Sequence, residues 1–73
     1  MAIKIIEDFM ALEIDGVPVA TATRQPDGRW KVTDWPGCYD RNQAITALAI
    51  TELLQAGYRT DHPLVRALRE ELR

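Results

Sequence analysis

The side chains best suited to covalent chemistry are few and lie far apart in this sequence. Cys38 is the single cysteine, His62 is the single histidine, and the chain contains no serine. A catalytic thiol needs a nearby base or a helix N-terminus to favour its thiolate, and Asp40 instead adds negative charge beside Cys38. One histidine and one cysteine also fall short of the ligands that a zinc site needs. We therefore expect no catalytic residue, no metal site and no cofactor.

The glycine and aspartate residues fall at positions typical of turns and helix caps. All four glycines are isolated, so neither a phosphate-binding loop nor a dinucleotide motif occurs. Asp61 and His62 precede Pro63, where a helix-capping role accounts for both residues. Asp27, Asp34 and Asp40 also stand at predicted turns or caps. The sequence therefore predicts a protein that is not an enzyme.

Three basic residues, Arg24, Arg29 and Lys31, form the main positive cluster of the predicted sheet. Arginine residues on a sheet can read guanine edges in the major groove of DNA. The whole chain, however, has 9 basic and 11 acidic residues and a net charge of -2, which does not favour binding driven by phosphate charge. DNA binding through this face is therefore an alternative function.

The first half of the chain is predicted to form an antiparallel meander of three strands. Residues 10–21 alternate in polarity on either side of Asp15-Gly16, a pair typical of a two-residue hairpin turn. The turn predicts three cross-strand pairs on the core face: Ile14 with Val17, Leu12 with Val19, and Met10 with Thr21. Whether residues 3–8 extend the first strand stays open.

A third strand is predicted over residues 29–35, after the turn of residues 25–28. A four-residue loop sets Thr23 opposite Trp30, so that Trp30 faces the core and the basic cluster faces away from it. Trp35 comes five residues later and then faces away from the core as well. An exposed tryptophan beside arginine is a candidate hot spot for a protein partner. The alternative is that Trp35 packs against the loop that leads to the helix.

A long helix is predicted over residues 41–56, with Asp40 as its N-cap, Gln43 as the capping-box partner and Gly57 just past its end. Its apolar residues cover more of the circumference than a three-stranded sheet can bury. The surplus stripe consists of Ala47, Ile50 and Leu54. We expect this stripe, together with Trp35, to contact a partner.

A short second helix is predicted near the end of the chain, with Asp61 as its cap and Pro63 in its first turn. Its apolar residues recur every four positions, at Leu64, Leu68 and Leu72. Its charged residues, among them Arg66 and Arg69, form a solvated face. A helix of about three turns is marginal alone, so it either packs on the long helix or bridges to a second chain.

Together these elements predict an α+β fold in a single domain over residues 1–73. The order is a three-stranded antiparallel meander, a long helix and a short C-terminal helix (βββαα). No segment reaches the roughly 20 apolar residues of a membrane span, and acidic residues near the N-terminus interrupt any signal-peptide core. We therefore expect a cytoplasmic protein.

Three short segments resemble known proteins. Pro36-Gly37-Cys38, followed by an alanine-rich helix, resembles the partial ribonuclease-like domain of HicB-type antitoxins, which implies binding of a small toxin without catalysis. Residues 27–30 resemble the arm-binding domain of tyrosine integrases, which implies DNA contacts by Arg29 and Lys31. The chain as a whole is similar to small proteins of actinobacteria and their phages, in which the helix opening of residues 42–47 is familiar, and this similarity implies no activity.

The sequence therefore predicts a non-enzymatic module for protein interaction or regulation. The apolar surplus on the long helix and the small size of the chain favour a homodimer or a complex with a small protein partner.

Overall fold

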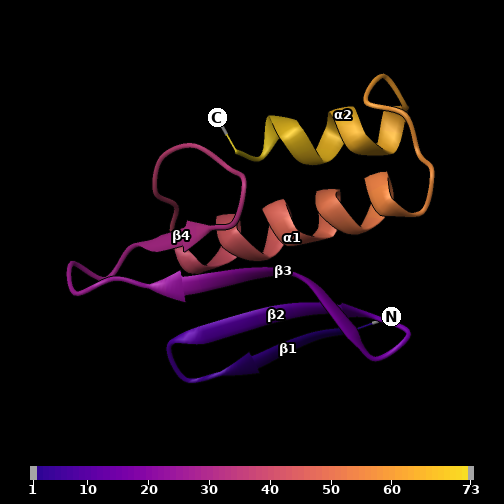
Figure 1. Ribbon diagram of the computed structural model, residues 1–73. Coiled ribbons are helices and arrows are strands. Elements are labelled where there is room, and N and C mark those ends of the chain that lie inside the picture. Colours follow the sequence, from indigo (N-terminus) through magenta and orange to yellow (C-terminus); the bar gives the residue numbers. More distant parts are fainter. Residues whose placement is uncertain (1, 73) are drawn as a thin grey trace.

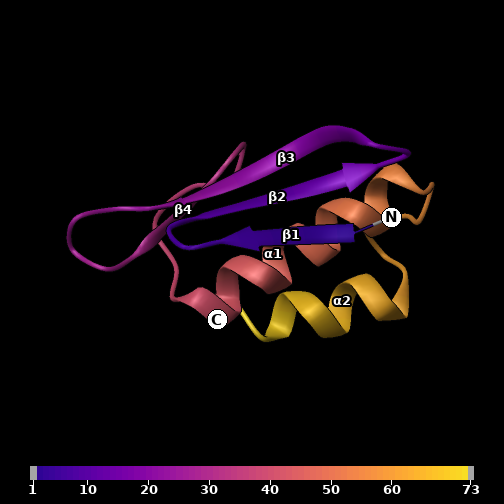
Figure 2. The ribbon, with the colours of Figure 1, turned by 90° about the horizontal axis from the view of Figure 1, so that it is seen from below.

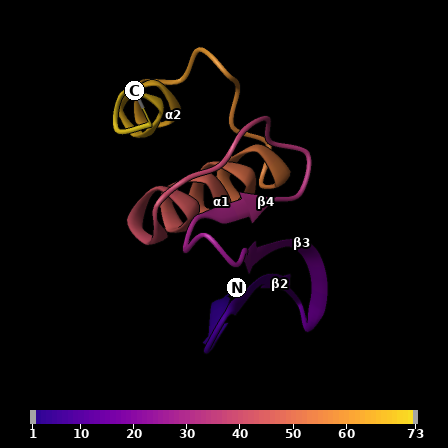
Figure 3. The ribbon, with the colours of Figure 1, turned by 90° about the vertical axis from the view of Figure 1, so that its left-hand side faces the viewer.

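A four-stranded antiparallel sheet and two helices make up the fold in the computed structural model, which describes residues 2–72. The elements are β1 (Ala2–Ile6), β2 (Phe9–Ile14), β3 (Val17–Arg24), β4 (Trp30–Val32), α1 (Arg41–Gln55) and α2 (Pro63–Glu70). The strands form a meander in the order β1-β2-β3-β4. Figure 1 and Figure 3 show α1 next to the sheet and α2 on the far side of α1. The predicted α+β class is confirmed, but the meander has four strands and not the three that were predicted.

The additional strand, β1, pairs along its length with β2. Ile6 faces Phe9 across a two-residue connection, Glu7-Asp8. Glu7 has a φ of 49°, a conformation that glycine adopts more readily than other residues. This turn could not be predicted from the sequence, because it consists of two acidic residues. Asparagine and glycine are the residues that usually indicate a two-residue hairpin turn.

The β2–β3 hairpin confirms the predicted turn but not the register beyond it. Ile14 faces Val17 across the turn, and a register shift between Leu12 and Glu13 leaves Val19 without a partner in the ladder. The pairs that follow are Leu12 with Ala20 and Met10 with Ala22, so the predicted pairs of Leu12 with Val19 and Met10 with Thr21 are wrong. This one-residue bulge turns the alanines of β3 toward the core.

The β3–β4 hairpin also differs from its predicted register by one residue. Arg24, and not Thr23, faces Trp30. β4 ends at Val32, three residues before its predicted end. Asp34 has a φ of 65°, which is incompatible with an extended strand. Trp35 therefore lies outside the sheet rather than on its outer face.

The core lies between the inner face of the sheet and one side of α1. Its buried members from the strands are Met10, Leu12, Ala20, Ala22, Trp30 and Val32, and those from α1 are Ala44, Ala47 and Leu48. Trp30, whose place in the core is confirmed, also exchanges backbone hydrogen bonds with Tyr39, at 2.7 and 2.9 Å. These bonds tie the loop between β4 and α1 to the edge of the sheet.

The start of α1 matches the predicted capping box. The Asp40 carboxylate accepts a bond from the Gln43 backbone N–H at 2.7 Å, and the Gln43 side chain accepts one from the Asp40 backbone N–H at 3.1 Å. Gly57 follows the C-cap with a φ of 97°, as expected for a residue just past a helix end. Local sequence therefore determines where α1 begins and ends.

The cap of α2 differs from the prediction by one residue. His62, and not Asp61, is the N-cap, and its Nδ1 accepts a hydrogen bond from the Leu64 backbone N–H at 3.1 Å. Asp61 instead forms an exposed ion pair with Arg59, at 3.6 Å. Pro63 occupies the first turn as predicted.

A second, smaller core lies between the two helices. Ile50 of α1 and Val65 of α2 are both fully buried, yet neither belongs to the cluster under the sheet. Figure 2 shows the two helices side by side along most of the length of α2. The short helix therefore covers the apolar side of α1 that the sheet leaves free.

Substitution at two neighbouring positions of α2 tests this packing. Val65→Ala removes two carbons from a closed site and should lower the free energy of unfolding by roughly 2 kcal/mol. Leu64→Ala, at a side chain that is 52% exposed, should change it by less than about 0.5 kcal/mol. Urea unfolding followed by tryptophan fluorescence measures both values. Equal losses for the two variants would show that α2 does not dock as described.

Candidate functional site

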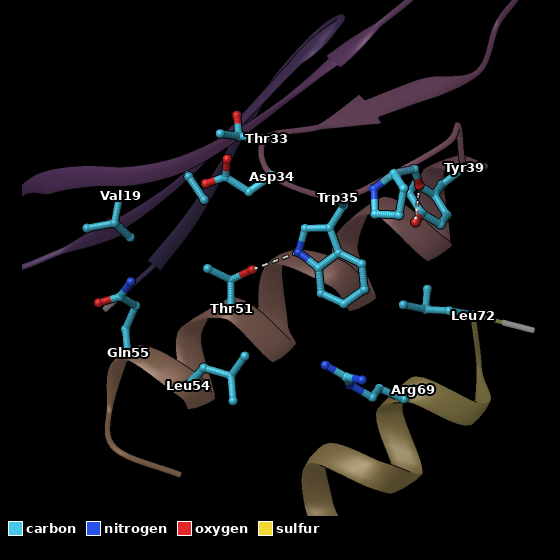
Figure 4. Close-up of a pocket in the computed structure, with 12 residues that line it drawn as sticks. Val19, Thr33, Asp34, Trp35, Tyr39, Thr51, Leu54, Gln55, Arg69 and Leu72 are labelled. Carbon is cyan, nitrogen blue, oxygen red and sulfur yellow. Dashed lines mark hydrogen bonds between the residues drawn. The ribbon is translucent and has the colours of Figure 1, made fainter. Parts of the chain in front are cut away.

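A hollow lies where the loop after β4, the second half of α1 and the end of α2 meet. It has a volume of about 700 Å³, within the range of about 300–1,000 Å³ that ligand pockets occupy. We call this hollow the Trp35 pocket. The residues used below are Trp35, Tyr39, Thr51, Leu54, Arg69 and Leu72, and Figure 4 shows them around the cavity.

Trp35 is held in place by α1 and by its own loop. Its indole Nε1–H donates a hydrogen bond to Thr51 Oγ1 at 3.2 Å. The Tyr39 ring meets the indole edge to face, with 6.4 Å between centroids and an interplanar angle of 83°. The Tyr39 hydroxyl in turn donates to the Pro36 carbonyl at 2.6 Å. Fixed in this way, the half-buried indole forms a wall of the pocket with little freedom to move.

The opposite wall comes from the two helices. Leu54 lies on α1, and Leu72 follows α2 and also packs against the main core. Both leucines are half-buried, so part of each apolar side chain still meets solvent at the pocket. Figure 4 shows the Arg69 side chain directed from α2 toward the space between Leu54 and Trp35. The pocket therefore combines apolar walls with one cationic group.

No ion pair between residues 2–72 neutralises the charge of Arg69. Ion pairs in the described residues join Lys4 to Glu13, Arg24 to Asp8 and Arg59 to Asp61, and none of them includes Arg69. Asp34 lines the other end of the pocket beside Val19, on the far side of the cavity from Leu72 in Figure 4. A cation beside half-exposed apolar walls suits an occupant that brings apolar groups together with a carboxylate.

The structure separates the four residues that the sequence assigns to partner binding. Ala47 and Ile50 are completely buried within the chain, Ala47 in the main core cluster and Ile50 outside it. Leu54 and Trp35 instead meet in the Trp35 pocket, where both keep contact with solvent. Two of the four residues therefore belong to a surface that a partner can reach.

The three residues assigned to DNA binding do not share a single face. Arg24 stands opposite Trp30, which faces the core, whereas Lys31 points to the outer face of the sheet. Arg24 also pairs with Asp8 at 3.2 Å. Arg29 lies in the loop between the strands, where its backbone N–H donates to Asp27. The predicted cluster on one face is therefore wrong, because of the one-residue change in register.

The residues considered for covalent chemistry lie apart from the pocket. Exposed Cys38 donates a weak hydrogen bond to the Gln25 side chain at 3.4 Å. His62 caps α2 and stacks edge to face on Tyr58, with ring centroids 4.8 Å apart. Within residues 2–72, the His, Cys, Asp and Glu side chains form no group of three or more that could hold a metal ion.

Sequence analysis missed most of the pocket residues, among them Arg69 and Leu72 at the end of the chain. Their spacing of three places them on one side of a helix, and this was the available signal. Arg69 was assigned to the solvated face, because nothing in the local sequence shows that Trp35 lies across from it.

Comparison with known proteins yields no relative: no family model, no curated protein and no solved structure matches the chain. The resemblances to HicB-type antitoxins and to integrase arm-binding domains therefore stay predictions. Among the helices of the described residues, neither is long and apolar enough to cross a membrane.

Two matched threonines test how Trp35 is held. Thr46 and Thr51 both donate to the carbonyl four residues earlier, at 3.1 and 3.0 Å, but only Thr51 also accepts a bond from Trp35. Thr51→Val should therefore cost about 1 kcal/mol more in the free energy of unfolding than Thr46→Val. Urea unfolding of the two variants measures the difference. Equal losses of unfolding free energy would mean that the hydrogen bond from the Trp35 indole to Thr51 does not stabilise the fold.

Proposed function

We propose that this chain is a non-enzymatic protein-interaction module that associates with a second copy of itself through the Trp35 pocket. The observation that carries the proposal is a solvent-accessible cavity with a fixed tryptophan, two half-exposed leucines and an arginine that forms no ion pair with any residue in the described part of the chain. The proposal places the protein in the cytoplasm, where its single exposed cysteine would stay reduced.

The composition of the pocket supports protein binding. Tryptophan, tyrosine and arginine are enriched among the residues that dominate binding energy at protein interfaces, and they act best in sites that can be closed to water. Trp35 is already immobilised by Thr51 and Tyr39, so little side-chain entropy is lost when a partner contacts it. The fixed indole therefore offers a preformed anchor point.

The contact surface differs from the one that the sequence suggests. Ala47 and Ile50 are fully buried within one chain. No second chain is therefore needed to bury the apolar side chains of α1 at these two positions. Leu54 is the member of that stripe that lines the pocket. Self-association is therefore proposed at the pocket and not along the buried stripe.

DNA binding remains the alternative proposal, but no specific observation favours it. Lys31 and Arg24 lie on opposite faces of the sheet, and Lys4, on the outer face, is paired with Glu13 at 3.4 Å. With a net charge of -2, the chain offers no broad positive surface to a phosphate backbone.

Sedimentation equilibrium of the purified chain tests self-association. We expect a reversible equilibrium with a dissociation constant between about 1 µM and 1 mM, which corresponds to about 4–8 kcal/mol. Arg69→Glu reverses the charge in the pocket and Leu54→Glu places a charge on its apolar wall, so each should weaken association at least about tenfold.

The matched control is Arg66→Glu, the same charge reversal at an exposed residue of α2 that does not line the pocket. This variant should associate as the unaltered chain does. A chain that stays monomeric at about 1 mM would refute the proposal. An equal loss of association in Arg66→Glu and Arg69→Glu would show that overall charge, and not the pocket, governs association.

A further inference from the structure

The turn between β1 and β2 carries an apolar and acidic surface that is exposed to solvent. Ile6 and Phe9 face each other across Glu7-Asp8, and their side chains are 63% and 41% exposed. Both lie on the outer face of the sheet, because Met10, the next residue along β2, faces the core. We call these four residues, Ile6 to Phe9, the β1–β2 tip.

The two acidic residues of the tip differ in their surroundings. Asp8 is paired with Arg24 at 3.2 Å, whereas Glu7 takes part in none of the ion pairs that join described residues. Glu7 also holds a φ of 49°, although glycine would occupy this position without strain. Of the two tip carboxylates, Glu7 is therefore the one that no ion pair between described residues engages.

The tip and the Trp35 pocket have complementary properties. The tip offers two large apolar side chains beside the Glu7 carboxylate, and the pocket offers apolar walls beside the Arg69 guanidinium. Neither charged group belongs to an ion pair between residues that the structure describes. An arginine and a carboxylate brought together out of water form a charge-assisted hydrogen bond with strict geometry. Apolar burial and this single ion pair would then specify one orientation of the contact.

The tip cannot fill the pocket of its own chain. Figure 1 and Figure 3 show β1 and α2 at opposite sides of the molecule, with α1 and the rest of the sheet between them. The tip is also fixed by the pairing of β1 with β2 on both sides of a two-residue turn. Contact between the two surfaces therefore requires two molecules.

From this complementarity we infer that the β1–β2 tip of one copy inserts Ile6 and Phe9 into the Trp35 pocket of a second copy, with Glu7 paired to Arg69. The inference rests on the proposed function, and it names the segment that occupies the pocket. Because tip and pocket are different surfaces, each contact is heterologous. Each copy has one β1–β2 tip and one Trp35 pocket, so associated copies form either a closed ring or a growing chain.

Variants that each disable one surface test the inference by sedimentation velocity. Phe9→Glu disables the tip, Arg69→Glu disables the pocket, and each alone should weaken self-association by about tenfold or more. An equimolar mixture of the two retains one working tip and one working pocket, so it should form one-to-one dimers and nothing larger. Leu64→Glu, which alters an apolar side chain outside both surfaces, should leave association unchanged.

A charge exchange tests the named ion pair. Glu7→Arg should weaken association when alone and recover it when mixed with Arg69→Glu, because each tip then meets a pocket of opposite charge. Glu7→Gln, which removes the charge and keeps the size, should be weakened when alone. Mixed with Arg69→Glu, it should form one-to-one dimers and nothing larger, because only the unaltered tip of Arg69→Glu meets an unaltered pocket, whereas the mixture with Glu7→Arg restores both contacts.

Each possible result supports or overturns the inference. Dimers in the first mixture and recovery in the second support it. Normal association of Phe9→Glu, together with loss in Arg69→Glu, overturns it and leaves the pocket as a docking site for another segment. A chain that is monomeric at every concentration overturns both the inference and the proposed function, whereas the previous result overturns the inference alone.

Discussion

The packing of α2 on α1 is the interaction on which the rest of the structure depends. The sheet buries one side of α1 and α2 packs on another, and Ile50 of α1 and Val65 of α2 are both fully buried outside the main core cluster. The same docking brings Arg69 and Leu72 across from Trp35. One hydrophobic contact between helices therefore completes the core and also forms a wall of the candidate site. A short helix that would be only marginally stable alone therefore determines which residues line the pocket.

The pocket stays open because the loop after β4 is held away from α2. Asp34 turns the chain out of the sheet with a positive φ, the Trp30–Tyr39 backbone bonds anchor the other end of the loop, and Thr51 fixes the indole. These constraints all come from within the chain, so no ligand is needed to shape the cavity. A preformed site of this kind loses little conformational entropy on binding.

Local signals in the sequence predicted much of the fold, and long-range packing accounts for what they missed. Caps and turns such as Asp40 with Gln43, Gly57 and Asp15-Gly16 were identified because a few neighbouring residues determine them. The bulge at Val19 escaped prediction, since alternation of apolar residues does not reveal one additional residue. Leu54 and Trp35 were predicted to contact a partner, and both line the Trp35 pocket. Their meeting with Arg69 depends on how α2 docks, which no local pattern encodes.

The most direct test of the account follows the two tryptophan indole signals in ¹⁵N–¹H spectra as the protein is diluted. Trp30 is buried in the core and serves as an internal reference, whereas Trp35 forms a wall of the pocket. If copies associate through the pocket, the Trp35 Nε1–H signal shifts with protein concentration and the Trp30 signal does not. If neither signal moves while sedimentation shows association, or if both move equally, the pocket is not where the copies meet.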